Sequence, residues 1–258
     1  METYADATKW LLAPTEHRTI RGMRLEFYLT DYSPHLLHSI GDAVAESRAE
    51  RWELTARTEA GDYASKEERQ VSRQRLMSFV GACPVAFRRL TSLTLHNVLL
   101  RNSEVHHLLN TCDRLEVLSL HCCESVGAPF LQIDAPSSSL VALELHYCYY
   151  FSVQLTRVPN LERVLDNSNR NHPNIYFMLE LGGVPRLRDI NLSADHLLGY
   201  KDLNTSGFSA FFGNLRHIYL CDLNTHRMAW TLFILEAAPF LEKLSLKKQK
   251  VILESDFP

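Results

Sequence analysis

The sequence predicts an α/β fold built as a solenoid of stacked repeats. The phrase L-x-x-L-x-L occurs three times at intervals of 25 residues, at Leu90, Leu93 and Leu95, at Leu115, Leu118 and Leu120, and at Leu140, Leu143 and Leu145. Related phrases open at Leu161, Leu187, Leu215 and Leu241, often after a turn that contains Pro or Asp. One short strand with one short helix cannot bury its own apolar face, so this period indicates stacking. We therefore expect a horseshoe-like leucine-rich-repeat solenoid, with parallel strands on the concave face and short helices on the convex face.

Two degenerate units are expected before the clear phrases. Met23 and Leu25 begin an alternation typical of a strand, and Ser33 and Pro34 then provide the N-cap and first position of a helix. We expect the helix to bury Leu36, Leu37, Ile40 and Val44. A second strand is predicted at R-W-E-L-T-A-R, residues 51–57.

The domain organisation is expected to be simple. Residues 1–18 are predicted to be a lead-in segment, and residues 19–258 a repeat domain. A charged stretch at about 57–75 is predicted to be a solvated insertion that runs into a helix, or else a docking loop. That helix is expected to end before Cys83, because Pro84 disfavours helix in the residue before it.

Later elements are less regular. Ser103 is expected to cap a helix that buries Val105, Leu108 and Leu109, and another helix is expected to bury Trp230, Phe233, Ile234 and Ala237. In the phrase at Leu161, the run Val164-Leu165-Asp166 is expected to break the alternation.

Composition restricts the classes of function. The 258-residue chain is 46% hydrophobic, with a formal net charge of -3, which gives no electrostatic case for nucleic-acid binding. There is no secretory signal and no apolar run long enough to span a membrane, so we expect an intracellular protein, cytoplasmic or nuclear. The six cysteines lack the dense spacing of a disulfide scaffold, and we expect reduced, packed thiols.

Candidate contact residues alternate with the inward leucines, and should therefore face outward on the strand side. They are Thr94, His96, Ser119, His121, Glu144 and His146. The three histidines recur at the 25-residue period, so they should lie in register on neighbouring strands. Three interpretations remain: a row that contacts a partner, a metal-binding ladder, or an echo of the repeat without a role. A zinc site needs four convergent ligands, so no metal or other cofactor is assigned.

The aromatic run His146 to Phe151 adds Tyr147 to these candidates, because exposed tyrosines often dominate the binding energy of interfaces. A second column, Val98, Cys123 and Cys148, should turn inward, so its thiols are expected to be structural. The sequence contains no nucleophile, base and orienting group that can be named together, and we do not expect an enzyme.

Four passages support a resemblance to a known family. They are A-C-P-V-A-F-R-R-L-T-S-L-T-L-H-N-V, L-Q-I-D-A-P-S-S-S-L-V-A-L-E-L, F-G-N-L-R-H-I-Y-L and W-T-L-F-I-L-E-A-A-P-F-L-E-K-L. From about Ile20 to Leu246 the chain resembles the plant F-box/FBD/leucine-rich-repeat family, particularly its grass members. In that family an N-terminal F-box docks on the Skp1 adaptor of a cullin-based ubiquitin ligase, and the repeats select the substrate. Only the repeat portion is recognisable here, without the F-box or the C-terminal FBD segment.

The expected function is protein recognition on the concave face, as in the substrate-recognition repeats of an F-box receptor. A Skp1-type adaptor is expected to bind only if a missing or cryptic F-box is supplied. The alternative is a repeat protein that senses a small molecule or metal through its histidine row, or that acts as a scaffold. The substrate, the oligomeric state and the choice between nucleus and cytoplasm do not follow from the sequence.

Overall fold

The structure is a computed structural model, and it describes residues 21–29, 34–46, 49–61, 64–127, 130–150, 152–167, 178–181, 183–193, 212–223 and 234–248. The predicted lead-in segment, residues 1–18, lies outside the described residues. So do Trp230 and Phe233 of the last predicted helix; Ile234 and Ala237 of that helix are described and buried.

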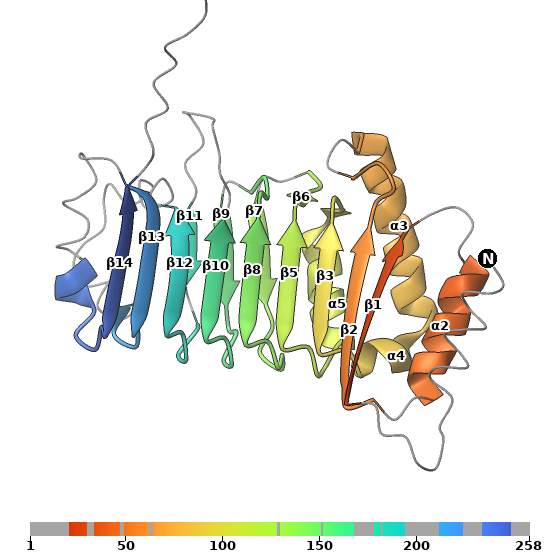
Figure 1. Ribbon diagram of the computed structural model, residues 1–258, viewed down its shortest axis with the longest axis horizontal. Coiled ribbons are helices and arrows are strands. Elements are labelled where there is room, and N and C mark those ends of the chain that lie inside the picture. The colour runs from red at the N-terminus through yellow and green to blue at the C-terminus, as the bar shows by residue number, and fades with distance from the viewer. Residues whose placement is uncertain are drawn as a thin grey trace, which may run out of the picture.

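A nine-stranded sheet runs the length of the molecule, in the order β1-β2-β3-β5-β8-β10-β12-β13-β14 (Figure 1). Every neighbouring pair is parallel. The strands are β1 Gly22–Tyr28, β2 Arg51–Arg57, β3 Ser92–His96, β5 Val117–His121, β8 Ala142–His146, β10 Arg163–Asn167, β12 Asp189–Ser193, β13 His217–Leu223 and β14 Lys243–Lys248. Because each strand pairs with the next strand of this series along the chain, each repeat adds one strand. The predicted α/β fold with parallel strands is confirmed.

The leucines of the recurring phrase form the core behind this sheet. Leu93 pairs in register with Leu118, and Leu118 with Leu143. All three are at most 2% exposed. Complete burial of a leucine side chain stabilises the fold by about 1.5–3 kcal/mol. Stacking of the repeats therefore supplies a continuous core that no single repeat could form.

Among the described residues, four helices lie near the first strands of the sheet, and a short helical turn at 234–237 precedes β14. The four helices are α2 Pro34–Glu46, α3 Lys66–Ala82, α4 Pro84–Arg88 and α5 Asn102–Thr111. Further along, a second parallel sheet takes their place, formed by β7 Phe130–Asp134, β9 Ser152–Thr156 and β11 Met178–Leu181. Two short strands, β4 Leu99–Leu100 and β6 Glu124–Ser125, pair with each other.

The expectation of short helices throughout this layer is therefore wrong for the middle repeats. In β7, Leu131 and Ile133 alternate with more exposed residues, a period of two that suits a strand. They pair in register with Val153 and Leu155 of β9. Cross-strand contacts between these apolar side chains replace the contacts that a helix would make.

The helix predicted after Ser33 is present as α2, and α3 ends at Ala82, before Cys83, as predicted; Ser33 and the side chains of Leu36 and Leu37 lie outside the described residues. Helix α2 begins at Pro34, and its Ile40 and Val44 are each 1% exposed. The Arg89 guanidinium donates hydrogen bonds to the Val44 and Ala45 carbonyl oxygens near the end of α2, at 2.9 and 3.1 Å. These carbonyls lie in the last turn, where a helix lacks internal donors.

Helix α3 includes part of the charged stretch that was predicted as an insertion. Ser65 and Glu68 form a capping box at its start: the Ser65 Oγ accepts from the Glu68 amide, and a Glu68 carboxylate oxygen accepts from the Ser65 amide. The Arg73 guanidinium lies 2.5 Å from Glu104 of α5, and both side chains are largely buried. Residues 66–75 thus lie in a helix that is packed into the repeat stack.

Two local predictions were wrong. Helix α5 begins two residues earlier than expected, because Arg101 rather than Ser103 occupies the N-cap, and the Arg101 amide donates to Glu104 at 2.9 Å. Strand β10 does not lose the alternation: Val164 and Asp166 point inward, in register with Leu143 and Leu145 of β8. Asp166, 1% exposed, occupies the place of a core leucine. Ladder pairing with β8 and β12 maintains the register across this polar side chain.

The inward column that follows the strands is confirmed. Val98, Cys123 and Cys148 are at most 1% exposed. The Cys123 Sγ lies 3.5 Å from the Leu95 carbonyl oxygen, and the Cys148 Sγ lies 3.2 Å from that of Leu120, so each thiol bonds to the preceding repeat. Burial raises the pKa of the Cys148 thiol well above its ordinary value. None of the six cysteines forms a disulfide bond, and Cys123 and Cys148 are structural thiols.

Candidate functional site

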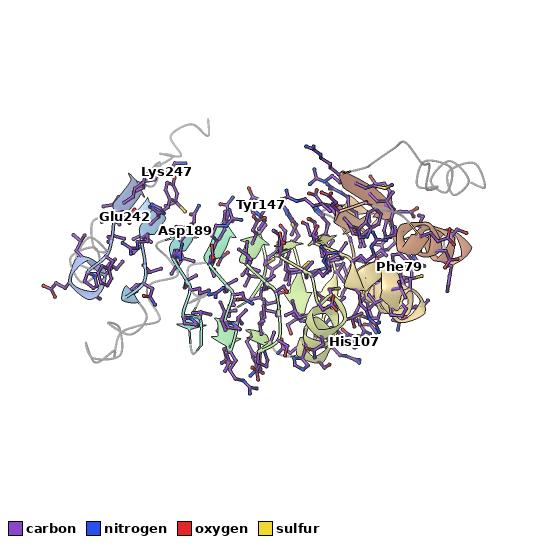
Figure 2. All side chains as sticks on the ribbon, turned by 90° about the horizontal axis from the view of Figure 1, so that it is seen from below. Phe79, His107, Tyr147, Asp189, Glu242 and Lys247 are labelled. Carbon is purple, nitrogen blue, oxygen red and sulfur yellow. The ribbon has the colours of Figure 1, made fainter. Side chains whose placement is uncertain are left out.

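The candidate contact residues lie together on the outer face of the nine-stranded sheet, which we call the strand face. Thr94, Ser119 and Glu144 pair in register along one row, and His96, His121 and His146 along the next. Figure 2 shows Tyr147 and Asp189 on one side of the molecule and His107 of α5 on the other. We call the part of the strand face on β3, β5 and β8 the histidine half.

The three histidine rings of this half stack on one another. The ring centroids of His96 and His121 are 4.2 Å apart with planes 20° from parallel, and those of His121 and His146 are 4.3 Å apart at 17°. The stack follows from the sheet, because neighbouring strands are spaced about 4.8 Å apart and equivalent side chains lie side by side.

Hydrogen bonds connect the stack to the row beside it. The His121 Nε2 lies 3.1 Å from the Ser119 Oγ, and Ser119 is only 4% exposed. Hydrogen bonds from His146 and then from Ser119 lower the pKa of Glu144, against the opposing effect of burial. The Ser119 hydroxyl thus contacts both Glu144 and the His121 ring, and the tautomer of His121 sets which of Ser119 and His121 donates.

The central imidazole resists protonation. Burial, then the neighbouring His96 and His146, and then Arg57 lower the pKa of His121 to about 4, whereas Glu144 raises it slightly. At neutral pH His121 is therefore uncharged. The stack presents a polar, aromatic strip rather than a strongly cationic one.

This geometry does not favour the metal-ladder interpretation. The imidazoles meet face to face, so their nitrogens do not converge on a common point. Among the residues that the structure describes, no group of three or more His, Cys, Asp or Glu side chains is placed to hold a metal ion.

Tyr147 occupies a strained backbone position at the rim of this half. Its φ is 54°, in the left-handed region that non-glycine residues rarely adopt, and 52% of the residue is exposed. Asn97 and Cys122 have φ of 56° and 51° at the equivalent place in the two preceding repeats. The backbone turn thus belongs to the repeat, while the exposed tyrosine ring belongs to this repeat alone.

A groove of about 390 Å³ lies further along the strand face, and none of the predicted contact residues except Glu144 lines it. The strands β8, β10, β12, β13 and β14 form it, and its outward side chains include Arg163, Leu165, Asn191, Tyr219 and Lys243. We call the part of the strand face on β10, β12, β13 and β14 the groove half. The alternation in D-I-N-L-S and H-I-Y-L-C could have located it, because it places Asn191 and Tyr219 outward.

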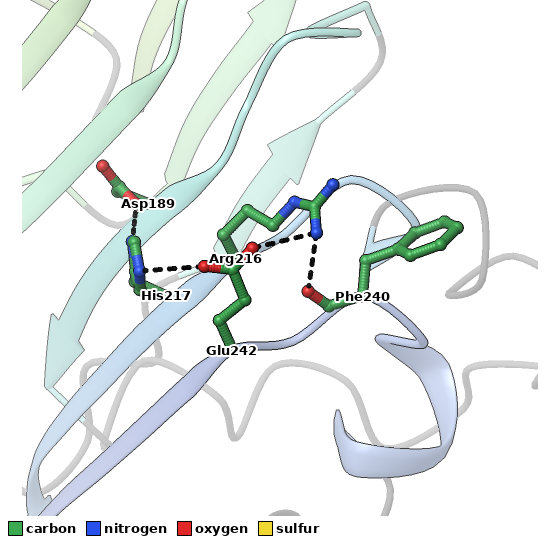
Figure 3. A network of polar contacts seen from close by, with 5 residues as sticks. All are labelled: Asp189, Arg216, His217, Phe240 and Glu242. Atoms are coloured by element: carbon green, nitrogen blue, oxygen red, sulfur yellow. Dashed lines mark hydrogen bonds and ion pairs between the residues drawn. The ribbon is translucent and has the colours of Figure 1, made fainter.

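A polar network includes two residues of the groove lining, Asp189 and His217 (Figure 3). The His217 Nδ1 lies 2.6 Å from the Asp189 Oδ1, and the His217 Nε2 lies 3.9 Å from the Glu242 Oε2. The Arg216 Nη1 lies 3.0 Å from the Glu242 Oε1 and donates to the Phe240 carbonyl oxygen at 3.4 Å. These contacts join β12 to β13 and the approach to β14.

In the part of the chain that the structure describes, no helix is both long enough and apolar enough to cross a membrane. A comparison with curated proteins gave no match.

Residues 68–196 match the family model described as FBD-associated F-box protein At5g56370, LRR repeats. The match covers half of the 258-residue chain. It runs from α3 to the end of β12 and so includes all three clear leucine phrases and the histidine half. Repeats of this class are generally protein-interaction modules. The chain therefore belongs to the family of leucine-rich repeats found in FBD-associated F-box proteins.

Proposed function

We propose that the chain is a protein-recognition module, a leucine-rich-repeat solenoid whose strand face binds a protein partner. The observation that supports this most directly is the strand face itself. It carries outward polar and aromatic side chains in register over the nine strands, and the helices and the second sheet lie on the other side or at the N-terminal end (Figure 1). An extended surface of this kind suits a macromolecule.

Within this module, the predicted contact residues form the histidine half and its rim: Thr94, His96, Ser119, His121, Glu144, His146 and Tyr147. Tyr147 is the strongest candidate for a dominant contact, because its exposed ring combines apolar area with a hydroxyl group. Ser119 is buried and would act by positioning His121 rather than by touching a partner.

The finer proposal is that the module selects substrates for an F-box type ubiquitin ligase. The family supports it, because the matching repeats are those of an F-box protein. Ubiquitin transfer would then belong to the ligase, and a Skp1-type adaptor would bind through an F-box rather than through these repeats.

The first experiment maps the binding face. A peptide and small-domain display library is selected on the immobilised 258-residue chain, and the enriched binders are measured against Tyr147→Ala. The matched control is His107→Ala, which alters an exposed side chain on the other side of the molecule (Figure 2). We expect Tyr147→Ala to weaken binding at least tenfold, about the loss of one interface hot spot, and His107→Ala to leave it unchanged. Binders that are lost only with His107→Ala would contradict the proposal.

The second experiment tests the ligase role. The chain and a version fused to an F-box of a relative are each measured for Skp1 binding by calorimetry. We expect only the fusion to bind and to direct ubiquitin onto a strand-face partner in a reconstituted ligase. A fusion that assembles but leaves a bound partner unmodified would contradict the ligase role and leave protein recognition intact.

A further inference from the structure

The groove half carries two cations that form no close ion pair with the described residues, although the charge of Glu144 acts on one of them, Arg163. Arg163 on β10 and Lys243 on β14 are exposed, and neither forms an ion pair with another described residue. Asp189 and His217, which lie between them, are already bound to each other at 2.6 Å. The two exposed cations, one toward each end of the groove, are therefore the charged groups that a ligand could pair with most directly.

The spacing of these cations suits an extended peptide. Arg163 pairs in register with Asp189, Asp189 with His217, and His217 with Lys243, so three strand intervals separate the two. At about 4.8 Å per interval this is about 14 Å. Four residues of extended chain span about the same distance, at about 3.4 Å per residue. Side chains four positions apart also lie on the same side of such a chain, so both could point at the groove.

Asp189 and His217 lie directly between the cations, and the next row of outward side chains, two residues further along the same strands, suits the middle of that peptide. Leu165, Asn191 and Tyr219 lie side by side in one row and are each partly exposed. Leucine and the tyrosine ring offer apolar area, and the asparagine amide both donates and accepts hydrogen bonds, as a peptide bond requires. Glu144 ends this row at β8, and its carboxylate would repel an acidic residue placed beyond Arg163.

We propose that the groove binds an extended acidic segment of a partner protein, with one carboxylate on Arg163 and a second, four residues away, on Lys243. The inference rests on the proposed protein-recognition function and names the chemistry of the partner. The middle residue between the two acids would be apolar and would pack on Leu165 and Tyr219.

The test uses the full chain and a fluorescein-labelled peptide of about ten residues, long enough to cover the groove at about 3.4 Å per residue. The peptide has two glutamates four positions apart, a leucine midway, and threonine or valine elsewhere to favour an extended backbone. Fluorescence polarisation measures the dissociation constant. We expect binding to weaken about tenfold when both glutamates become glutamine, and also when they are moved to three positions apart, which places them on opposite sides.

Variants of the protein locate the site. Arg163→Gln and Lys243→Gln should each weaken binding about fivefold, and Arg88→Gln, an exposed arginine of α4, should not change it. Arg163→Glu should restore binding to a peptide in which lysine replaces the matching glutamate. These substitutions alter exposed side chains, so the fold is preserved.

Equal binding of the glutamate and glutamine peptides, or no binding of either, would overturn the inference. The proposed function fails in a different way. If library binders are lost with Tyr147→Ala but show no acidic pair at this spacing, the acidic-peptide inference is wrong and protein recognition on the strand face stands.

Discussion

The histidine half and the groove half belong to one sheet, yet they use their outward side chains differently. In the histidine half, identical residues lie in register one strand apart, so the rings stack on each other and bond to Ser119 and Glu144. In the groove half the register brings together unlike residues, and Arg163 and Lys243 stay apart. Residues that recur regularly in a sequence can therefore form a surface whose polar side chains already contact one another. The less regular repeats beside it keep side chains that can contact a ligand.

The largest expected effect concerns the core beneath the histidine half. Leu120→Ala should lower the free energy of unfolding by about 3 kcal/mol, because Leu120 is fully buried and alanine leaves a cavity. Leu246 is in the same register row on β14 but is 44% exposed, so Leu246→Ala should cost less than about 1 kcal/mol. Urea denaturation measures both. Equal losses would show that the core is as tightly packed at β14 as at β5.

A second prediction concerns close backbone contact between repeats. A Cβ on Gly183 would lie 2.5 Å from the Arg157 amide nitrogen, so Gly183→Ala should destabilise the protein by about 2 kcal/mol. Gly81 is the matched control, because a Cβ there meets nothing within 4 Å and the residue lies in α3. Gly81→Ala should stabilise by about 0.5–1 kcal/mol, since alanine is the better helix former. Thermal unfolding should move in opposite directions for the two variants.

The third prediction concerns the pH dependence of the free energy of unfolding. It tests whether the contacts among the residues of the histidine half contribute to stability. His121 has a pKa of about 4 in the folded protein, against about 6.5 when unfolded. Between these values the unfolded chain binds more protons, so the free energy of unfolding should fall as the pH falls from about 6.5. Glu144, whose folded pKa is lowered, should add a further loss below its unfolded pKa of about 4.3.

The His121→Gln variant should flatten the slope between pH 6.5 and 4.5, with urea denaturation at several pH values as the measurement. His107→Gln serves as the control, because it removes an exposed histidine and keeps the stack. An unchanged slope in His121→Gln would mean that the stack does not govern the acid sensitivity of the fold.

Most of the fold could be predicted from the leucine spacing, because burial on one face fixes both the alternation and the register. The 25-residue period correctly placed β3, β5 and β8 side by side. The exceptions were decided by contacts between distant residues. The alternation at Leu131 and Ile133 is too short to decide between strand and helix, and their pairing with Val153 and Leu155 decides it. Asp166 was expected to break the alternation of the strand, because it is polar. Its inward position follows from the pairing of β10 with β8 and β12, which the local sequence does not show.

The site was less predictable, for a physical reason. Alternation correctly gave the facing of His96, His121 and His146, but facing does not tell whether a side chain is already bound by its neighbours. Ser119 was expected to be a surface contact and is 4% exposed, because it lies between the histidine row and Glu144. The position of the groove depends on the sizes of the side chains that five neighbouring strands place next to one another. Those neighbours are known only once the sheet is assembled.

The smallest expected effect, at Tyr147, separates stability from recognition. Its left-handed backbone costs a non-glycine residue about 1 kcal/mol, and asparagine tolerates this conformation better than most residues. Tyr147→Asn should therefore keep or raise the free energy of unfolding by up to about 1 kcal/mol, while strand-face binders lose affinity. Asn97, at the same place two repeats earlier, shows that the turn accepts asparagine. If the variant instead lost stability together with binding, the tyrosine ring would contribute to packing. The left-handed backbone at Tyr147 would then be explained by stability and not by recognition of a partner.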